Sequence, residues 1–284
     1  MPTSSDRDAS LIERVARHER AFVLALGGYA VEVPGAHLVV HERLPAPALN
    51  FVQVVEVPTS RQAAFFERAL DHYFQRAIRP TFRVPTPVPP HLDQGLRSFG
   101  FRRIDADHLV LIAEHVRSPE ASGFQVRPAV PDQLGQIVEL WGAPGSPEEF
   151  RRSLEVLWNF PHAEERVEPL IVTHDDGSPL SAALVYRNRG VTGVYAVTTR
   201  TDARGRGGAT ALVLAACDRP IARESDVTYL PTDHRRGSER MLGFGFRLLQ
   251  RQAVYALDRD AELALPPVGP ASPPRWRPPR ARTA

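Results

Sequence analysis

The spacing of apolar and polar residues predicts alternating helices and strands in the first part of the chain. Helical spacing places Leu11, Val15 and Phe22 on one face of the first segment, with arginine and glutamate on the others. Short apolar runs bounded by Gly, Pro and Asn predict strands. In chain order the pattern predicts a helix over 9–26, strands at 29–33, 37–42 and 50–57, a helix over 61–77, a strand at 81–84, a short helix over 91–99 and a strand pair over 102–114.

The second part of the chain repeats this order after two additional helices. Three apolar runs are separated by turn signals at Asp176-Gly177 and Asn188-Arg189-Gly190, which predicts an antiparallel meander. In chain order we predict a strand at 124–130, helices over 131–141 and 146–160, the meander, a helix over 207–219, a strand at 226–231, a short helix over 238–244 and a closing strand through 253–257.

The tetrapeptide Phe-Gly-Phe-Arg closes the series of elements in both parts. It begins at Phe99 and at Phe244, each time after a short helical pattern and before a strand-like run. Phe99 lies 39 residues after Ser60, and Phe244 lies 37 residues after Gly207, where the corresponding helix patterns begin. Matching order and spacing indicate two copies of one fold. We interpret the tetrapeptide as a structural hinge, with a helix end, a glycine and a phenylalanine that returns to the core.

These patterns predict a first domain over 1–115, a linker over 116–123 and a second domain over 124–260. The last residues, 261–284, consist largely of Pro and Arg, and we expect a disordered tail. An Arg-Pro tail can contact nucleic acid or an acidic surface. Its composition favours a solvated tail without a dedicated partner.

Composition narrows the possible functions. With 43% hydrophobic residues the chain can bury a core, and it contains no apolar run long enough to span a membrane and no signal-peptide pattern at its start. The single cysteine, Cys217, excludes an internal disulfide and fits a cytoplasmic location. The formal net charge of +2 argues against nucleic-acid binding by the folded part. The histidines show no metal-ligand spacing, so we expect no metal.

The turn before the helix at 207–219 carries the best chemical signal. Its sequence is Arg204-Gly205-Arg206-Gly207-Gly208-Ala209. The first amides of a helix lack acceptors within the helix, and the helix dipole adds partial positive charge at this end. Small residues leave the backbone open to close approach, and the two arginines add positive charge. Such a turn suits a pyrophosphate group.

Two common phosphate-binding motifs fit this turn poorly. A P-loop requires a lysine, and all 35 Lys+Arg residues of the chain are arginine. A dinucleotide fingerprint begins at Gly205-Arg206-Gly207, but Thr210 holds the place of its last glycine. The preceding strand belongs to an antiparallel meander rather than to a βαβ unit.

The second part of the chain resembles the GCN5-related N-acetyltransferases, the GNAT superfamily. The acyl-CoA loop of that family has Gln or Arg, two variable residues, Gly, one variable residue and Gly or Ala, which 204–209 matches. Val197-Thr198-Thr199 falls where the family's strand bulges and pairs with the pantetheine arm, and Gly237 and Gly245-Phe246 match its closing glycines. The acetyl-CoA-binding residues that the resemblance implies are Val197, Thr198, Thr199, Arg204, Gly205, Arg206, Gly207, Gly208, Ala209 and Thr210.

The resemblance covers about 124–258 by motif, and 11–113 only by element order and the repeated tetrapeptide. It implies an α/β (α+β) fold of two tandem GNAT-like domains, each a mixed, mostly antiparallel sheet flanked by helices. In the first domain, the segment that corresponds to the loop has no glycine, and Pro58 removes a backbone donor there. We therefore expect the first domain to be degenerate and without a cofactor.

The resemblance further implies an N-acetyltransferase that uses acetyl-CoA. The acceptor, a primary amine of a small molecule or peptide, attacks the thioester directly, while the enzyme holds the reactants in line and bulge amides polarise the carbonyl. Many family members use as acid a tyrosine four residues before the second of the closing glycines. Met241 holds that position and cannot donate a proton. The candidate replacements are Tyr195, Asp233 and His234.

Two other functions stay open at this point. Met241 motivates a catalytically silent module that binds acyl-CoA for regulation. The arginine-rich tail motivates a nucleic-acid binder, whose binding would be salt-sensitive and lost with the tail.

Overall fold

The structure, a computed structural model, describes residues 4–105, 107–114, 116, 124–141, 147–159, 165–173, 177–219, 222, 225–233 and 235–257. The expected tail, and all of the expected linker except Val116, lie outside these residues. The chain forms two compact units, which we describe separately. Among the described residues, unit 1 contains 4–27 and 109–250, and unit 2 contains 28–108 and 251–257.

These units differ from the sequential domains that we expected with a boundary near 116–123. The first helix groups with the second part of the sequence, and the end of the last strand groups with the first part. The physical reason is packing. Buried side chains of the first helix, such as Val15 and Phe22, contact the sheet of unit 1, and the last strand completes the sheet of unit 2.

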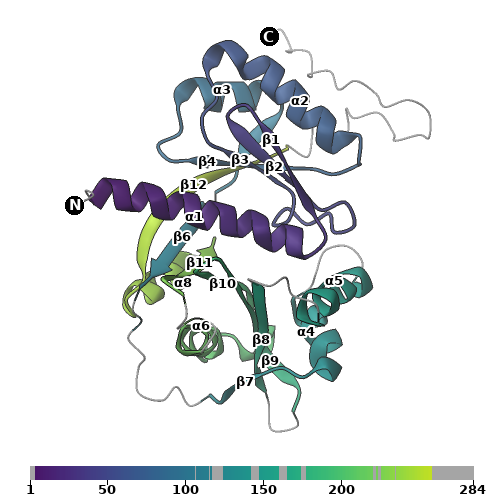
Figure 1. Ribbon diagram of the computed structural model, residues 1–284, viewed down its shortest axis with the longest axis vertical. Coiled ribbons are helices and arrows are strands. Elements are labelled where there is room, and N and C mark those ends of the chain that lie inside the picture. Colours follow the sequence, from purple (N-terminus) through teal and green to yellow (C-terminus); the bar gives the residue numbers. More distant parts are fainter. Residues whose placement is uncertain are drawn as a thin grey trace. The chain divides into compact units, whose positions relative to one another are not determined.

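Unit 1 contains a mixed sheet with helices on both faces. Its sheet has the order β6-β11-β10-β9-β8-β7, in which only β10 and β11 run parallel. In Figure 1, α6 lies on one face of β8, β9 and β10, and α4 and α5 lie on the other. The elements are α1 (Ser4–Ala25), β6 (His108–Ala113), β7 (Val126–Pro128), η2 (Pro131–Gln133), α4 (Leu134–Trp141), α5 (Pro147–Asn159), β8 (Glu165–Thr173), β9 (Pro179–Asn188), β10 (Val191–Thr199), η3 (Thr201–Ala203), α6 (Gly208–Asp218), β11 (Val227–Thr232), α8 (Arg235–Leu242) and the first residues of β12 (Arg247–Leu257).

Helix α1 packs on the same sheet, against β10 and β9. Its buried face carries the residues that the helical spacing singled out, and it also includes His18 and Glu19. Neither α1 nor any other helix in the described part of the chain is long and apolar enough to cross a membrane.

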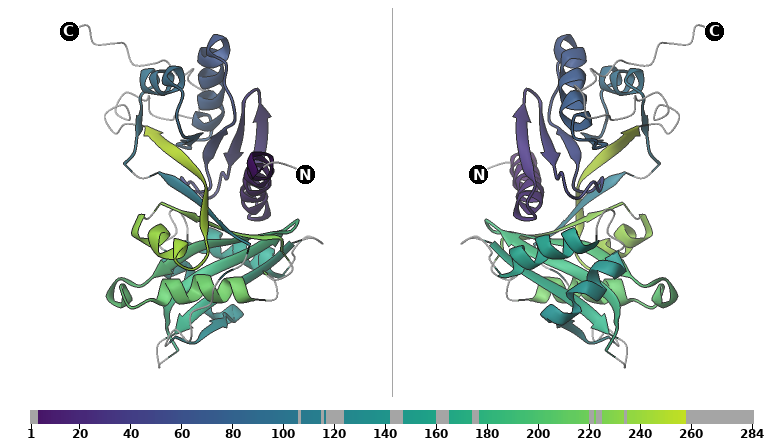
Figure 2. Two further views of the ribbon diagram at one scale, coloured as in Figure 1. Left: turned by 90° about the vertical axis from the view of Figure 1, so that its left-hand side faces the viewer. Right: turned by 90° about the vertical axis from the view of Figure 1, so that its right-hand side faces the viewer.

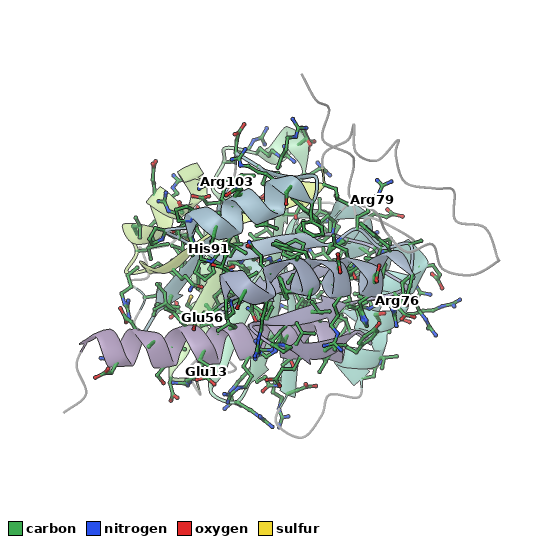
Figure 3. All side chains as sticks on the ribbon, turned by 90° about the horizontal axis from the view of Figure 1, so that it is seen from above. Glu13, Glu56, Arg76, Arg79, His91 and Arg103 are labelled. Atoms are coloured by element: carbon green, nitrogen blue, oxygen red, sulfur yellow. The ribbon has the colours of Figure 1, made fainter. Side chains whose placement is uncertain are left out.

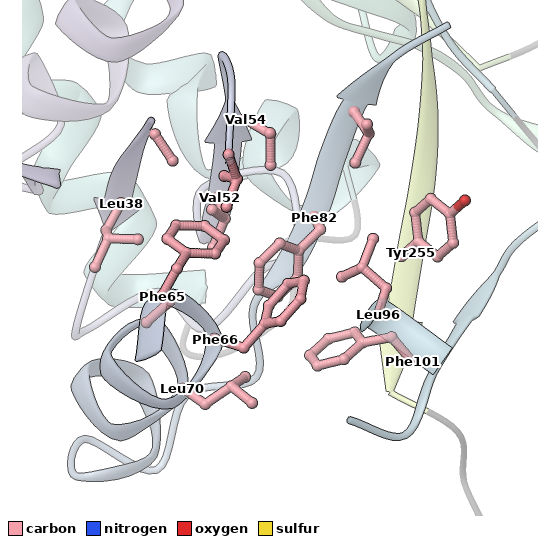
Figure 4. Close-up of a cluster of buried hydrophobic side chains, with 14 of the residues drawn as sticks. Leu38, Val52, Val54, Phe65, Phe66, Leu70, Phe82, Leu96, Phe101 and Tyr255 are labelled. Carbon is pink, nitrogen blue, oxygen red and sulfur yellow. The ribbon is translucent and has the colours of Figure 1, made fainter. Parts of the chain in front are cut away.

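Unit 2 contains a second sheet of the same kind. The order is β1-β2-β3-β4-β12, with β5 also paired to β12, and only β3 and β4 run parallel. Figure 4 shows Phe65 and Phe66 of α2 packed toward Phe82 of the sheet, with Phe101 beside it. The elements are β1 (Tyr29–Val33), β2 (Ala36–Val40), β3 (Phe51–Val54), η1 (Thr59–Arg61), α2 (Gln62–Phe74), β4 (Thr81–Pro85), α3 (Pro90–Ser98), β5 (Phe101–Arg103) and the second part of β12.

The two parts of the sequence exchange strands. Strand β6 comes from the first part but pairs with β11 in unit 1, where Leu111 lies opposite Leu230. Strand β12 comes from the second part but pairs with β4 and β5 in unit 2, where Tyr255 lies opposite Phe82 and Arg103. Figure 2 shows β12 as one long strand. The strand pair expected over 102–114 is thus corrected: both strands exist, but β5 pairs with β12 and β6 pairs with β11.

The repeated tetrapeptide has the same structure in both units, which confirms the hinge. Gly100 follows α3 with φ 84°, and Gly245 follows α8 with φ 99°. The next residue in each copy, Phe101 or Phe246, is buried. A left-handed glycine therefore turns the chain from a helix end into a strand in each unit.

We expect fragments 1–116 and 124–284, produced separately, to show no cooperative thermal transition. Each fragment lacks a strand that completes a buried sheet in the intact chain, and an open sheet edge favours aggregation. Scanning calorimetry and near-ultraviolet circular dichroism measure the transition. The matched control is the full chain cut at a protease site placed within 117–123, which should keep its transition because both pieces remain. A sharp transition of isolated 124–284 near that of the intact chain would contradict the exchange.

We expect Gly100→Ala and Gly245→Ala each to lower the free energy of unfolding by about 1–2 kcal/mol, because alanine is strained at positive φ. Gly135→Ala in α4 is the control: an added Cβ would meet no atom within 4 Å, and alanine favours a helix by about 0.5–1 kcal/mol. Urea unfolding measures all three. Equal changes in the free energy of unfolding at the three positions would show that positive φ is not the cause of the destabilisation.

Candidate functional site

The glycine-rich turn of unit 1 forms an open helix end. Gly205 has φ 80° and Gly207, the residue before α6, has φ 97°, so both positions favour glycine. No side chain caps this end, and the first helical hydrogen bond runs from the Ala211 amide to the Gly207 carbonyl oxygen. The earlier amides of α6 therefore lack acceptors within the helix. Arg204 and Arg206 are exposed beside them. This arrangement fits a pyrophosphate group.

Strand β10 is interrupted by a bulge just before this turn. Its pairing with β9 shifts between Tyr195 and Thr198, so that Ala196 and Val197 face a single residue of β9. Ala196 has φ 51°, a left-handed conformation that is uncommon for alanine. A bulge leaves one residue outside the ladder of hydrogen bonds. The bulge lies at Ala196 and Val197, so it overlaps the predicted segment 197–199 at Val197, whereas Thr198 and Thr199 are paired with β9.

Strands β10 and β11 separate near the bulge. Their parallel pairing covers only three registers and ends with Gly193 opposite Tyr229. Strand β10 continues to Thr199 and β11 to Thr232. The two strand edges that face each other beyond Gly193 can hold an extended ligand that carries amide groups of its own.

A groove of about 510 Å³ adjoins the bulge and the turn. It contains three residues predicted from the sequence, Thr198, Thr199 and Arg204. The sequence analysis did not predict the other lining residues, which are Gln136, Glu139, Leu140, Ser178, Pro179, Arg200 and Thr201. Three of them, at 136, 139 and 140 in α4, have the helical spacing that indicates one shared face.

The two arginines that line the groove differ in how far their positive charge is already paired within the protein. Arg200 donates to the carboxylate of Asp202 at 2.7 Å, and this hydrogen bond lowers the pKa of Asp202. Arg204 donates to the main-chain oxygen of Thr199 at 3.3 Å, which is a neutral acceptor. Arg204 therefore keeps more of its charge for an anionic ligand than Arg200 does.

The remaining predicted cofactor residues lie in the same segment. Val197 packs partly buried against the core of unit 1, so its backbone rather than its side chain is available at the bulge. Gly208, Ala209 and Thr210 form the first turn of α6. The predicted cofactor residues thus lie in one contiguous segment of unit 1, from β10 to the first turn of α6.

The three proposed acids or bases have different surroundings. Tyr195 is mostly buried beneath α1, and Asp233 is exposed after the end of β11. His234 lies outside the described residues. Met241, at the family's acid position, is buried in the core of unit 1 beside Phe246 and presents no proton donor.

Helix α1 adds two buried polar side chains that the sequence did not single out. His18 Nδ1 lies 2.9 Å from the Tyr195 hydroxyl oxygen, and Nε2 lies 3.2 Å from the Tyr186 carbonyl oxygen. The Tyr229 hydroxyl donates to the carboxylate of Glu19 at 2.5 Å. Burial lowers the pKa of His18 to about 4, against the opposing effects of the Tyr186 carbonyl and Glu19. The imidazole is therefore neutral at pH 7.

Neither a metal nor a thiol is part of this arrangement. Among the described residues, no group of three or more His, Cys, Asp or Glu side chains could hold a metal ion. Burial raises the pKa of Cys217 to about 12, so its thiol is protonated at pH 7 and is a poor nucleophile.

Unit 2 has the corresponding elements with a shorter first strand and no bulge. The parallel pairing of β3 and β4 also covers three registers and ends with Gln53 opposite Arg83, but β3 continues only to Val54, and β3 pairs with β2 without a shift in register. The amides of Val55 and Glu56 both donate to the Gly35 carbonyl oxygen. His91 of α3, labelled with Glu56 in Figure 3, accepts a 2.7 Å hydrogen bond at its carbonyl oxygen from the Gln62 side chain. Protein groups thus occupy the start of α2.

Comparisons with known proteins identify the fold. No family model and no curated protein sequence matches the chain. Among solved structures, a GCN5-related N-acetyltransferase from Kribbella flavida aligns with 88% of this chain and 97% of its own, at TM-score 0.63 and 16% identity. One from Sphaerobacter thermophilus aligns with 78% and 76%, at TM-score 0.58 and 16% identity.

A tandem GNAT protein from the clavulanic acid biosynthesis pathway also aligns, over 78% of this chain and 77% of its own, at TM-score 0.53 and 15% identity. The structure therefore has the fold of the GCN5-related N-acetyltransferases, in a mixed and mostly antiparallel form that spans most of the chain.

We expect His18 to make folding sensitive to mild acid. Burial lowers the pKa of His18 from its ordinary value of 6.5 to about 4 in the folded chain, so between these pH values the unfolded chain binds a proton and the folded chain does not. The stabilisation is complete above pH 6.5 and is lost as the pH falls towards 4, at a limiting slope of about 1.4 kcal/mol per pH unit. Urea unfolding at several pH values measures the slope. His18→Gln should remove this contribution, and an unchanged slope would contradict it.

Proposed function

We propose that the protein is an N-acetyltransferase that transfers the acetyl group of acetyl-CoA to a primary amine of a small molecule or peptide. One observation supports the proposal. Within one segment of unit 1, three features follow one another: a strand pair that separates, a bulge, and a helix end without a side-chain cap. The separation opens a slot, the bulge exposes backbone groups, and the helix end fits an anion. These are the requirements for holding an extended pantetheine arm that ends in a pyrophosphate.

In this proposal the chain mainly holds and orients the reactants. The amides at the start of α6, with Arg204 and Arg206, hold the phosphates. The backbone at 197–199 aligns the pantetheine arm, and an amide of the bulge polarises the thioester carbonyl. Acetyl-CoA supplies an activated acyl group when bound. The amine nitrogen forms the new bond to the acetyl carbon, the carbon–sulfur bond breaks, and the amine loses a proton to solvent.

The buried Met241 does not prevent this reaction. A thiol has an ordinary pKa of about 8.5, so the thiolate is a tolerable leaving group without an acid. In-line positioning of two reactants is worth several kcal/mol of the barrier on its own. Asp233 and His234 remain candidates for the proton transfers, because both follow β11, whose edge borders the slot.

We further propose that unit 2 binds no acetyl-CoA. Strand β3 ends one residue after its last pairing with β4 and has no bulge, the amides of Val55 and Glu56 donate to the Gly35 carbonyl oxygen, and Pro58 has no backbone N–H. Its role is to support the fold through the exchanged strands.

A second candidate is a module that binds acyl-CoA without turnover. The burial of Met241 in the core favours it, because the family's usual acid position then serves packing alone. The two candidates differ in one measurement. An acetyltransferase releases free thiol in the presence of its amine, and a silent module releases none across a broad panel of amine metabolites and peptides with labelled acetyl-CoA.

We expect acetyl-CoA at 100 times its Kd to raise the melting temperature by about 5–10 °C. Gly207→Glu should abolish the shift, because a carboxylate at the helix end repels phosphate and blocks the approach. Gly27→Glu is the matched control, since Gly27 has the same φ of 97° and open space around its Cα. It should keep the shift. Absence of a shift in the wild type at millimolar acetyl-CoA would refute the proposal.

A further inference from the structure

Helix α4 contributes part of the lining of the groove beside the bulge. Glu139 and Leu140 lie in the last turn of this helix, and both line the groove together with Thr198 and Thr199 of β10. The helix packs on β9 and β10, on the face of the sheet that α6 does not cover (Figure 1). A ligand in this groove therefore lies next to the strand segment assigned above to acetyl-CoA.

The carboxylate of Glu139 has no counter-charge within the described part of the chain. Its side chain is exposed, and none of the described residues forms a hydrogen bond or an ion pair with it. The last turn of α4 contains no basic residue. The helix dipole adds partial negative charge at this end, which disfavours a carboxylate and favours a cation. Glu139 is therefore placed where a positively charged ligand would be stabilised.

The positive charges of the groove come from the segment that follows β10. Arg200 donates to the carboxylate of Asp202, and Arg204 donates to the main-chain oxygen of Thr199 beside the start of α6. The groove is thus negative where α4 lines it and positive where the turn before α6 lines it. Glu139 repels the phosphates of acetyl-CoA, which the turn attracts. The negative part of the groove therefore suits a reactant other than the cofactor.

Apolar side chains accompany the carboxylate of Glu139. Leu140 is half-buried and packs against the cluster that contains Ile137, and Pro179 is buried at the start of β9. Both line the groove. Apolar surface of this kind favours methylene groups, which leave water on contact. A carboxylate beside apolar side chains fits a cation on an alkyl chain.

The nitrogen that attacks the thioester and the cation that Glu139 attracts are different groups. An alkyl amine is protonated at pH 7, because its pKa is about 10, and only its neutral form is a nucleophile. A nearby carboxylate favours the protonated form and so opposes attack by the same nitrogen. Glu139 is therefore suited to a second nitrogen, which keeps its charge throughout the reaction.

We propose that the acetyl acceptor is an alkyl amine with a second positive charge, that Glu139 binds this charge, and that Leu140 contacts the methylene groups of the acceptor. Glu139 is thus a specificity-determining residue and neither an acid nor a base. The inference rests on the proposed acetyltransferase function and names the substrate class of that function.

The test uses the full-length protein and three amines of matched length. Cadaverine has a second ammonium group, n-pentylamine has none, and δ-aminovalerate has a carboxylate in its place. We expect kcat/KM for cadaverine to be about fivefold or more above that for n-pentylamine, with δ-aminovalerate the slowest. The preference should shrink as salt rises from about 0.05 to 0.5 M, because screening weakens a charge pair near the surface.

Glu139→Gln keeps the size of the side chain and removes its charge. We expect the KM for cadaverine to rise about fivefold or more, with kcat, the KM for n-pentylamine and the Kd of acetyl-CoA each within twofold of wild type. Glu139→Arg should reverse the order, so that δ-aminovalerate becomes a better acceptor than cadaverine. Asp132→Asn is the matched control, since Asp132 is an exposed acid of η2 that does not line the groove. It should leave the preference unchanged.

Several results would overturn the assignment. An active wild type without a preference for cadaverine would do so, as would a Glu139→Gln protein that keeps the preference or whose KM rises equally for cadaverine and n-pentylamine. A fall in kcat for both amines would show that Glu139 acts as a base. Tighter binding of acetyl-CoA by Glu139→Gln, with the amines unaffected, would assign the groove to the cofactor.

The failure of this inference can be distinguished from the failure of the proposed function. A wild type that acetylates amines of the broad panel, but none with a second positive charge, overturns the inference alone. A wild type that releases thiol with no amine at all overturns the inference together with the proposed transfer.

Discussion

The early end of the pairing between β10 and β11 is the constraint on which the candidate site depends. Parallel pairing stops at Gly193, although both strands continue for several residues. Backbone amides and carbonyls inside a protein require partners. Beyond Gly193 the facing edges of β10 and β11 do not pair with each other, and this is where we propose that the pantetheine arm binds. The bulge at Ala196 and the open end of α6 follow in the same segment, so the chain itself sets the spacing between these features.

The corresponding elements of unit 2 differ beyond the paired registers. Strand β3 ends at Val54, one residue after its last pairing with β4, and the amides of Val55 and Glu56 donate to the Gly35 carbonyl oxygen. The space beside α2 is filled by aromatic side chains, including Phe66 and Phe82, that pack as a core. The two units therefore share a topology and differ in the segment that follows the parallel strand pair.

The sequence predicted the features that depend on local backbone requirements. Gly205 and Gly207 are conspicuous because positive φ favours glycine, and the duplicated Phe-Gly-Phe-Arg marks the same turn twice for the same reason. These backbone requirements involve only a few neighbouring residues, so the glycines that meet them form a local pattern in the sequence. The Phe99 and Phe244 copies could be matched without knowledge of any long-range contact.

Features that depend on distant partners were not predictable in the same way. Strands β5 and β6 have the apolar pattern of strands whether they pair with each other or with β12 and β11, so the exchange left no local signal. His18 and Glu19 resemble a solvated stretch of a charged helix. Their burial follows only from contacts with Tyr195 and Tyr229, which lie 177 and 210 residues further along the chain.

The strand exchange and the α1 contacts together show why unit 1 depends on the first part of the chain, although unit 2 has no glycine-rich loop at the start of α2. A glycine-rich loop contributes little to the free energy of folding, because glycine costs backbone entropy and an open helix end gains nothing without its ligand. Its loss from unit 2 therefore carries no penalty in stability. The loss of β6 or α1 would leave the sheet of unit 1 without a strand and its buried tyrosines without partners, which costs far more. The fold of unit 1 thus requires β6 and α1 from the first part of the chain, whereas it does not require a glycine-rich loop in unit 2.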